Sequence, residues 1–152
     1  MRFWRICRRR YAAEAGSGEG ARLYGGRWNS RGVRVVYAST SLALAAVETF
    51  VNLDPNLLPE DLVSIEGEIP GDLRVDKLDP EVLPAGWQKS RDRRVERFGD
   101  EWIRRSESVA LLVPSAAIRG EWNLLLNPAH NGFSQIQFRI PERFEFDARM
   151  FR

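Results

Sequence analysis

The pattern of apolar and polar positions along the chain predicts short strands and two main helices. An aromatic-rich alternation over residues 3–7 and a β-branched run over 33–38 predict the first two strands. Similar runs, bounded by turn residues, predict the remaining strands at 62–69, 73–78, 108–113, 122–126, 133–140 and 143–146. We expect an α+β fold with mixed or antiparallel β-sheets and a few flanking helices.

Two segments carry helical patterns. A Ser-Thr-Ser run at 39–41 can cap the first helix, which runs to about residue 53, before an Asp-Pro pair. This helix is apolar nearly all round, which predicts burial on several sides. The second helix is expected over 90–105, although Gly99 lowers its propensity. Its apolar residues share one face, namely Val95, Phe98, Trp102 and Ile103.

Glycines punctuate the segment between the first two strands. Residues 15–20 contain a G-x-G-x-G run, but no strong strand leads directly into this run and no helix is expected after it. The dinucleotide-binding fingerprint requires both elements, so a Rossmann fold is disfavoured. Residues 24–32 are expected to continue as an ordered loop.

Length and composition narrow the class of protein. A chain of 152 residues with 43% hydrophobic and 29% charged residues fits one globular domain, which we expect to span 1–152. No apolar run approaches the roughly 20 residues that a membrane span needs. The N-terminus lacks the pattern of a secretory signal, and Cys7 is the only cysteine, so we expect a cytoplasmic location.

Charge is distributed unevenly. Residues 1–34 carry nine arginines and two acids, whereas residues 48–81 carry ten acids and two basic residues. These regions could attract different partners. The Arg8-Arg9-Arg10 run could contact nucleic acid, but no recognisable nucleic-acid-binding module accompanies it.

Glu48 is the most informative single residue. A carboxylate within this apolar helix costs roughly several kcal/mol of desolvation unless it is paired or faces a cleft. An ion pair with an N-terminal arginine and a functional role both remain open at this point.

Arg27 and Tyr37 are candidates for ligand binding. Arg27 follows two glycines that let the backbone approach a ligand, and its guanidinium could grip a pyrophosphate or carboxylate. Tyr37 ends a strand and could stack on a planar ligand. A solvent-exposed arginine in a turn and a buried core tyrosine are the alternatives.

Small polar residues gather late in the chain at predicted strand ends, where they could line a pocket or form turns. They are Ser115, Asn123, Asn127 and His130. His130 is the only histidine, and without a second ligand beside it no metal site is expected.

Together these motifs resemble the RES domain family, which is named after an arginine, a glutamate and a serine. The matching residues are Arg27 in Gly-Gly-Arg-Trp-Asn, Glu48 in Ala-Ala-Val-Glu and Ser115 in Val-Pro-Ser. The resemblance also covers Val-Tyr-Ala-Ser at 36–39 and the late run from Trp122 through Asn123 and Asn127 to His130. Their joint order covers almost the whole chain.

The resemblance implies an ADP-ribosyltransferase-like fold and a bacterial toxin that degrades NAD+ by hydrolysis or phosphorolysis. It implies catalytic roles for Arg27, Tyr37 and Glu48, with Ser115 orienting the ligand or the glutamate. Asn123, Asn127 and His130 are expected to bind substrate. No cofactor is expected, since NAD+ is the substrate and inorganic phosphate a potential co-substrate. The expected partner is an Xre-like antitoxin, through which nucleic acid would be contacted only indirectly.

Two other functions compete with NAD+ degradation. The first is ADP-ribosylation of a protein target, for which the donor half of the site would be the same. The second is a non-enzymatic nucleic-acid-binding module, which gives no reason for a carboxylate in an apolar helix.

Overall fold

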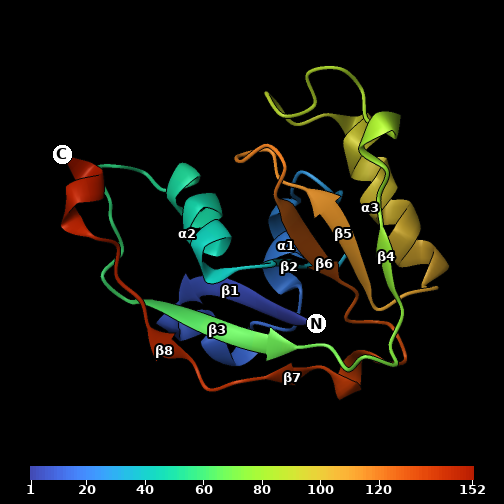
Figure 1. Cartoon of the computed structure of the whole chain (residues 1–152), viewed down its shortest axis with the longest axis horizontal. Helices are drawn as coiled ribbons and strands as arrows, with labels where there is room; N and C mark the ends of the chain where they lie inside the picture. Colours follow the sequence, from blue (N-terminus) through green and yellow to red (C-terminus); the bar gives the residue numbers. More distant parts are fainter.

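A computed structural model describes all residues from Met1 to Arg152. Eight strands form one sheet, and helices lie beside it (Figure 1). The strands are β1 (Arg2–Arg8), β2 (Val36–Ser39), β3 (Leu62–Glu68), β4 (Val75–Lys77), β5 (Ala110–Pro114), β6 (Trp122–Leu126), β7 (Gln137–Phe138) and β8 (Glu142–Arg143).

The sheet order is β4-β5-β6-β2-β1-β3-β7, and β8 also pairs with β3. Only β4 and β5 are parallel, and every other pair is antiparallel. The join between β1 and β2 rests on a single facing pair, Trp4 and Ser39, whereas β1 pairs with β3 along its whole length. The sheet therefore opens into two halves next to β2, and Figure 1 shows these halves running in different directions.

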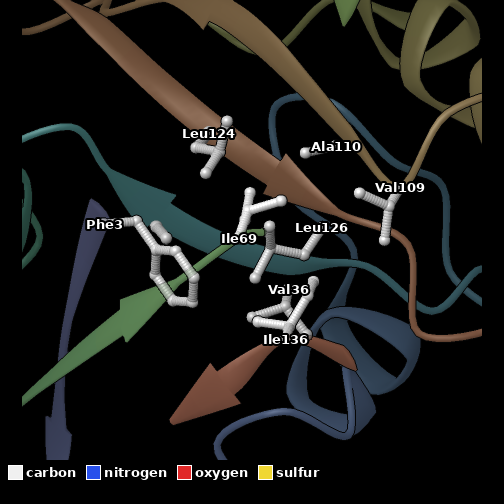
Figure 2. Close-up of a cluster of buried hydrophobic side chains, with 9 residues drawn as sticks. Phe3, Val36, Ile69, Val109, Ala110, Leu124, Leu126 and Ile136 are labelled. Carbon is white, nitrogen blue, oxygen red and sulfur yellow. The ribbon is translucent and has the colours of Figure 1, made fainter. Parts of the chain in front are cut away.

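Strand alternation divides the core between two faces of the sheet. Val36, Leu124 and Leu126 belong to one buried cluster, which Phe3 from the other half of the sheet completes (Figure 2). The intervening Leu125 belongs to a second cluster on the opposite face. This second cluster packs against helix α3 (Arg93–Arg105).

The predicted α+β architecture with a mixed sheet and flanking helices is confirmed. Helix α2 (Leu42–Val51) begins where predicted, because the Ser41 side chain accepts a hydrogen bond from the Leu44 backbone nitrogen at 3.1 Å. Its predicted burial on several sides is wrong: only Leu44 and Ala45 are buried, and Val51 is 58% exposed. Helix α2 therefore packs against the sheet with one face only.

None of the helices is both long enough and apolar enough to cross a lipid bilayer.

Three other local predictions need correction. A short helix, α1 (Glu19–Tyr24), follows the glycine-rich run, where a continuing loop was expected. The strand expected over 33–38 forms only from Val36, and the two strands expected over 133–146 shrink to β7 and β8. Turns η1 (Arg9–Glu14), η2 (Pro80–Val82), η3 (Phe133–Gln135) and η4 (Ala148–Phe151) are single 3₁₀ segments.

Helix α3 confirms the predicted apolar face and explains its glycine. Val95 and Trp102 are buried, while Phe98 and Ile103 pack against the same cluster. A Cβ built on Gly99 would lie 1.7 Å from the Trp28 carbonyl oxygen. Gly99 therefore lets the backbone of the loop that carries Arg27 lie directly against α3.

We predict that Gly99→Ala destabilises the protein by about 1–3 kcal/mol, as overpacking does. The contact is with backbone, which cannot rotate away, so the gain in helix propensity of about 1 kcal/mol does not offset it. Urea denaturation measures the effect. Gly71→Ala is the control, because a Cβ there meets nothing within 4 Å. Equal midpoints for the two variants would contradict this account of the packing.

Candidate active site

A cavity of about 1080 Å³ lies beside the opening between β1 and β2. Its lining includes Arg27 from the loop after α1, Tyr37 from β2, Glu48 from α2 and Asn123 from β6. A smaller cavity of about 420 Å³ shares Tyr37, Glu48 and Asn123 with it. Pockets of roughly 300–1,000 Å³ accommodate drug-sized ligands, so the space suits a dinucleotide.

The strand register brings the polar residues to one face. Ser39 faces Asn123 across the β2–β6 pair, and Tyr37 lies two residues earlier on the same face. Asn123 in turn faces Val113 of β5, and Ser115 follows two residues later. These polar groups therefore point to the side of the sheet where α2 presents Glu48.

Two neutral donors fix the Glu48 carboxylate. Ser115 Oγ and Asn123 Nδ2 each donate to Glu48 Oε1 over 2.6 Å. Glu48 takes part in no salt bridge, so the alternative of an ion pair with an N-terminal arginine is not observed. Oε2 has no hydrogen-bond partner in the protein and is not among the buried unsatisfied atoms. One carboxylate oxygen is thus anchored while the other stays accessible.

The two donors are themselves oriented by neighbours. Ser115 Oγ accepts hydrogen bonds from the backbone nitrogens of Ala117 at 3.1 Å and Ile118 at 3.0 Å, which leaves its proton for Glu48. Ser39 Oγ donates to Asn123 Oδ1 over 2.7 Å. This bond sets the amide orientation that turns the Asn123 amino group toward the carboxylate.

Tyr37 supports the loop that carries Arg27. Its hydroxyl donates to Asn29 Oδ1 over 2.6 Å and accepts from the Trp28 backbone nitrogen over 3.0 Å. Burial raises the pKa of Tyr37, so the phenol stays neutral at physiological pH. A Cβ on Gly26 would lie 2.5 Å from the same hydroxyl, so this glycine is required for the contact.

Arg27 is docked rather than free in solvent. Its Nη1 donates to the Trp87 carbonyl oxygen over 2.6 Å, and its guanidinium carbon lies 5.8 Å from the centroid of the Trp87 ring. No acidic side chain pairs with it, so its positive charge is available to a ligand in the cavity that it lines.

Arg5 is a site residue that the sequence analysis did not single out. It lines both cavities, and its Nη1 donates to the Tyr37 carbonyl oxygen over 2.7 Å where β1 leaves β2. Its Nε is buried without a partner, and burial lowers the pKa of the guanidinium. The alternation of residues 3–7 indicated this placement, because it puts Arg5 on the same strand face as Phe3. Phe3 is fully buried, so this face points into the protein.

Asn127 and His130 do not line either cavity. Asn127 is fully buried, donates to Ser106 Oγ over 3.2 Å and accepts from the Ala129 backbone nitrogen over 3.0 Å. His130 Nδ1 accepts from the Gly132 backbone nitrogen over 2.9 Å. Both side chains shape the turn after β6. No group of three His, Cys, Asp or Glu side chains is placed to hold a metal ion.

The sequence model of the RES domain matches residues 2–147. The chain belongs to the RES domain family. It is 41% identical to a protein named "Prs ADP-ribosylating toxin" from a Sphingobium species, over 99% of this chain and 96% of that relative. It is 38% identical to a "Toxin Res" from Yersinia enterocolitica, over 99% of each chain.

A solved structure shares the fold. The matching chain belongs to the MbcT–MbcA toxin–antitoxin complex of M. tuberculosis and aligns with a TM-score of 0.65 at 21% identity. The alignment covers 94% of this chain and 83% of that one. The overall arrangement of strands and helices is therefore shared with a chain of that complex.

We predict that Tyr37→Phe lowers the free energy of unfolding by about 1–3 kcal/mol. The substitution leaves the Trp28 backbone N–H and the Asn29 side-chain oxygen Oδ1 without their Tyr37 partner. Urea denaturation measures the loss. Tyr11→Phe is the control, because Tyr11 is 51% exposed and its hydroxyl makes no hydrogen bond. A Tyr37→Phe protein as stable as the control would show that the hydroxyl does not support the loop.

Proposed function

We propose that this protein is the toxin of a toxin–antitoxin pair and that it cleaves the bond between nicotinamide and ribose in NAD+. The names of its relatives, an ADP-ribosylating toxin and a Res toxin, support the toxin assignment. One observation carries the chemistry: Glu48 lines a dinucleotide-sized cavity with Oε1 anchored and Oε2 unpaired.

Cleavage of this bond develops positive charge on the ribose, in an oxocarbenium-like transition state. The electron pair of the breaking bond passes to the ring nitrogen, and the Oε2 oxygen of Glu48 faces the sugar cation. A fixed carboxylate stabilises this charge more than it stabilises the ground state, which lowers the barrier. Because Ser115 and Asn123 are neutral donors, they orient the carboxylate without cancelling its charge.

The leaving group explains why so few acid–base residues are needed. Nicotinamide departs as a neutral pyridine and requires no proton from the protein. His130, the only histidine, accepts a hydrogen bond within a turn outside the cavity. A general acid is therefore unnecessary for this step.

Arg5 and Arg27 are the proposed anchors for the pyrophosphate. Both line the large cavity and neither pairs with an acidic side chain. Arg5 offers a buried Nε–H with no acceptor in the protein, a donor that a phosphate oxygen would satisfy. The Tyr37 ring, in the same lining, would orient the nicotinamide ring.

The acceptor of the ADP-ribosyl group distinguishes two candidate functions. Water or inorganic phosphate as acceptor gives NAD+ degradation. A protein acceptor gives ADP-ribosylation, which the 41% identical relative named "Prs ADP-ribosylating toxin" favours. Incubation of NAD+ labelled in the ADP-ribose part with cell lysate separates them. Free ADP-ribose marks hydrolysis, ADP-ribose-1″-phosphate marks phosphorolysis, and labelled protein marks transfer.

An antitoxin partner follows from the same proposal. The neighbouring toxin was solved as a complex with its antitoxin. We propose an Xre-like antitoxin that binds this chain and covers the cavity, so that NAD+ cannot reach Glu48. Co-expression should then restore the cellular NAD+ level.

We predict that Glu48→Gln lowers the rate of NAD+ loss by about 100- to 1000-fold while the protein remains folded. The amide keeps the shape but removes the charge that would face the sugar cation. Chromatography of NAD+ and nicotinamide measures the rate. Glu14→Gln is the matched control, because Glu14 lines the same cavity but makes no hydrogen bond to the groups around Glu48. Full turnover by Glu48→Gln would remove this carboxylate from the mechanism.

We predict that Arg27→Ala raises the KM for NAD+ or lowers kcat/KM by about tenfold or more, as the loss of a charge-assisted contact does. Steady-state kinetics and titration calorimetry measure the effect. Arg31→Ala, an exposed neighbour outside the cavity lining, controls for the loss of general positive charge. Unchanged affinity and unchanged rates for Arg27→Ala would refute the pyrophosphate role.

A further inference from the structure

We infer that a group of exposed side chains in the lining of the large cavity, here called the aromatic rim, is the subsite for the adenine ring of the dinucleotide. The rim consists of Tyr11, Leu23 and Tyr24, which are 51%, 48% and 71% exposed and all line the cavity. This inference rests on the proposed function for the identity of the ligand, but the site can be tested by binding alone.

The clustering of these side chains needs an explanation. Large apolar side chains exposed singly are ordinary, but four of them line this one cavity: the three of the rim and Val51 of α2. Tyr11 belongs to η1 and the other two rim residues to α1, so two separate segments contribute to the rim. Base–aromatic stacking contributes appreciably to binding whichever base is bound, because every base presents a π-face.

The backbone leaves room for a ring beside Tyr24. Gly20 lies one helical turn before Tyr24 on the same face of α1 and also lines the cavity. A Cβ built on Gly20 would meet no atom within 4 Å, and its backbone does not need a positive φ. The absence of a side chain at this position keeps the Tyr24 ring accessible from the cavity.

Charge decides which ring of the dinucleotide the rim receives. The nicotinamide ring is cationic in NAD+ and is expected beside the unpaired oxygen of Glu48. The rim belongs to other elements than α2. The segments η1 and α1 carry two acids: Glu19 is paired with Arg22 and Arg34, and Glu14 lines the cavity without an ion pair. The Tyr11 ring lies 4.8 Å from the guanidinium carbon of Arg10, whereas Leu23 and Tyr24 offer neutral side chains. The α1 part of the rim therefore suits the neutral adenine, with Arg5 and Arg27 in the same lining for the pyrophosphate.

Titration calorimetry with AMP and with nicotinamide mononucleotide tests the assignment. Tyr24→Ala should weaken AMP binding about tenfold, whereas Tyr24→Phe, which retains the ring, should bind AMP as the natural protein does. Gly20→Leu should also weaken AMP binding, because its side chain would occupy the space beside Tyr24. None of the three changes should alter the affinity for nicotinamide mononucleotide. Ile140→Ala, an 86% exposed residue outside the cavity, should change neither affinity.

Three results would overturn the inference: no measurable AMP binding, AMP affinity unchanged in Tyr24→Ala, or an equal loss for both nucleotides. Because neither ligand needs to be cleaved, the outcome is independent of catalysis. A protein that binds AMP through Tyr24 but leaves NAD+ intact would retain the ring subsite and lose the proposed function. If Tyr24→Ala cleaves NAD+ with the KM of the natural protein, the proposed function stands and the adenine subsite at Tyr24 is refuted.

Discussion

The Glu48 carboxylate is anchored by neutral hydrogen-bond donors rather than by a cation, and the proposed chemistry depends on this choice. An arginine in place of these donors would form an ion pair with Glu48. Its positive charge would cancel the negative charge that faces the ligand. Ser115 and Asn123 both donate to one oxygen, so the carboxylate is fixed in direction and keeps its negative charge. The cations of the site, Arg5 and Arg27, are bound instead to backbone carbonyl groups.

This arrangement depends on an interruption of the sheet, where β1 and β2 pair over only one position. The two halves meet at one facing pair, Trp4 and Ser39, and separate beside it. The carbonyl group of Tyr37 would lose its partner at this opening, and the half-buried Arg5 side chain supplies one. The same opening lets a large cavity reach the sheet. Glu48 of α2 and Arg27 of the loop after α1 both line this cavity. The loop is held by the Tyr37 hydroxyl on one side and lies against Gly99 of α3 on the other.

Much of this arrangement could be predicted from local sequence patterns. Period-two alternation predicted β1 and β3, and the amphipathic pattern predicted α3, because those signals depend on burial of one face. An apolar run bounded by turn residues predicted β6. The odd carboxylate in α2 pointed to Glu48, the Gly-Gly-Arg run pointed to Arg27, and the resemblance to RES domains grouped both with Ser115. Bringing Ser115 and Asn123 against Glu48 required the strand register, which no local pattern contains.

Three further features of the structure lay outside what the local patterns could show. Helix α1 has only six residues, too few for a periodic signal. Arg5 was not singled out in the sequence, although the alternation of its strand places it on the same face as Phe3, which is fully buried. Asn127 and His130 lie in a turn outside the cavity, and short polar residues at strand ends serve turns and pockets equally well in sequence.

The most direct test of the central claim is a crystal structure of the Glu48→Gln protein with NAD+ bound. The account predicts the ribose carbon that bears nicotinamide within about 3–4 Å of the side chain at position 48, on the side opposite Ser115 and Asn123. It also predicts the pyrophosphate against the guanidinium of Arg5 or Arg27. A dinucleotide bound with its nicotinamide ribose away from position 48, or outside this cavity, would contradict it.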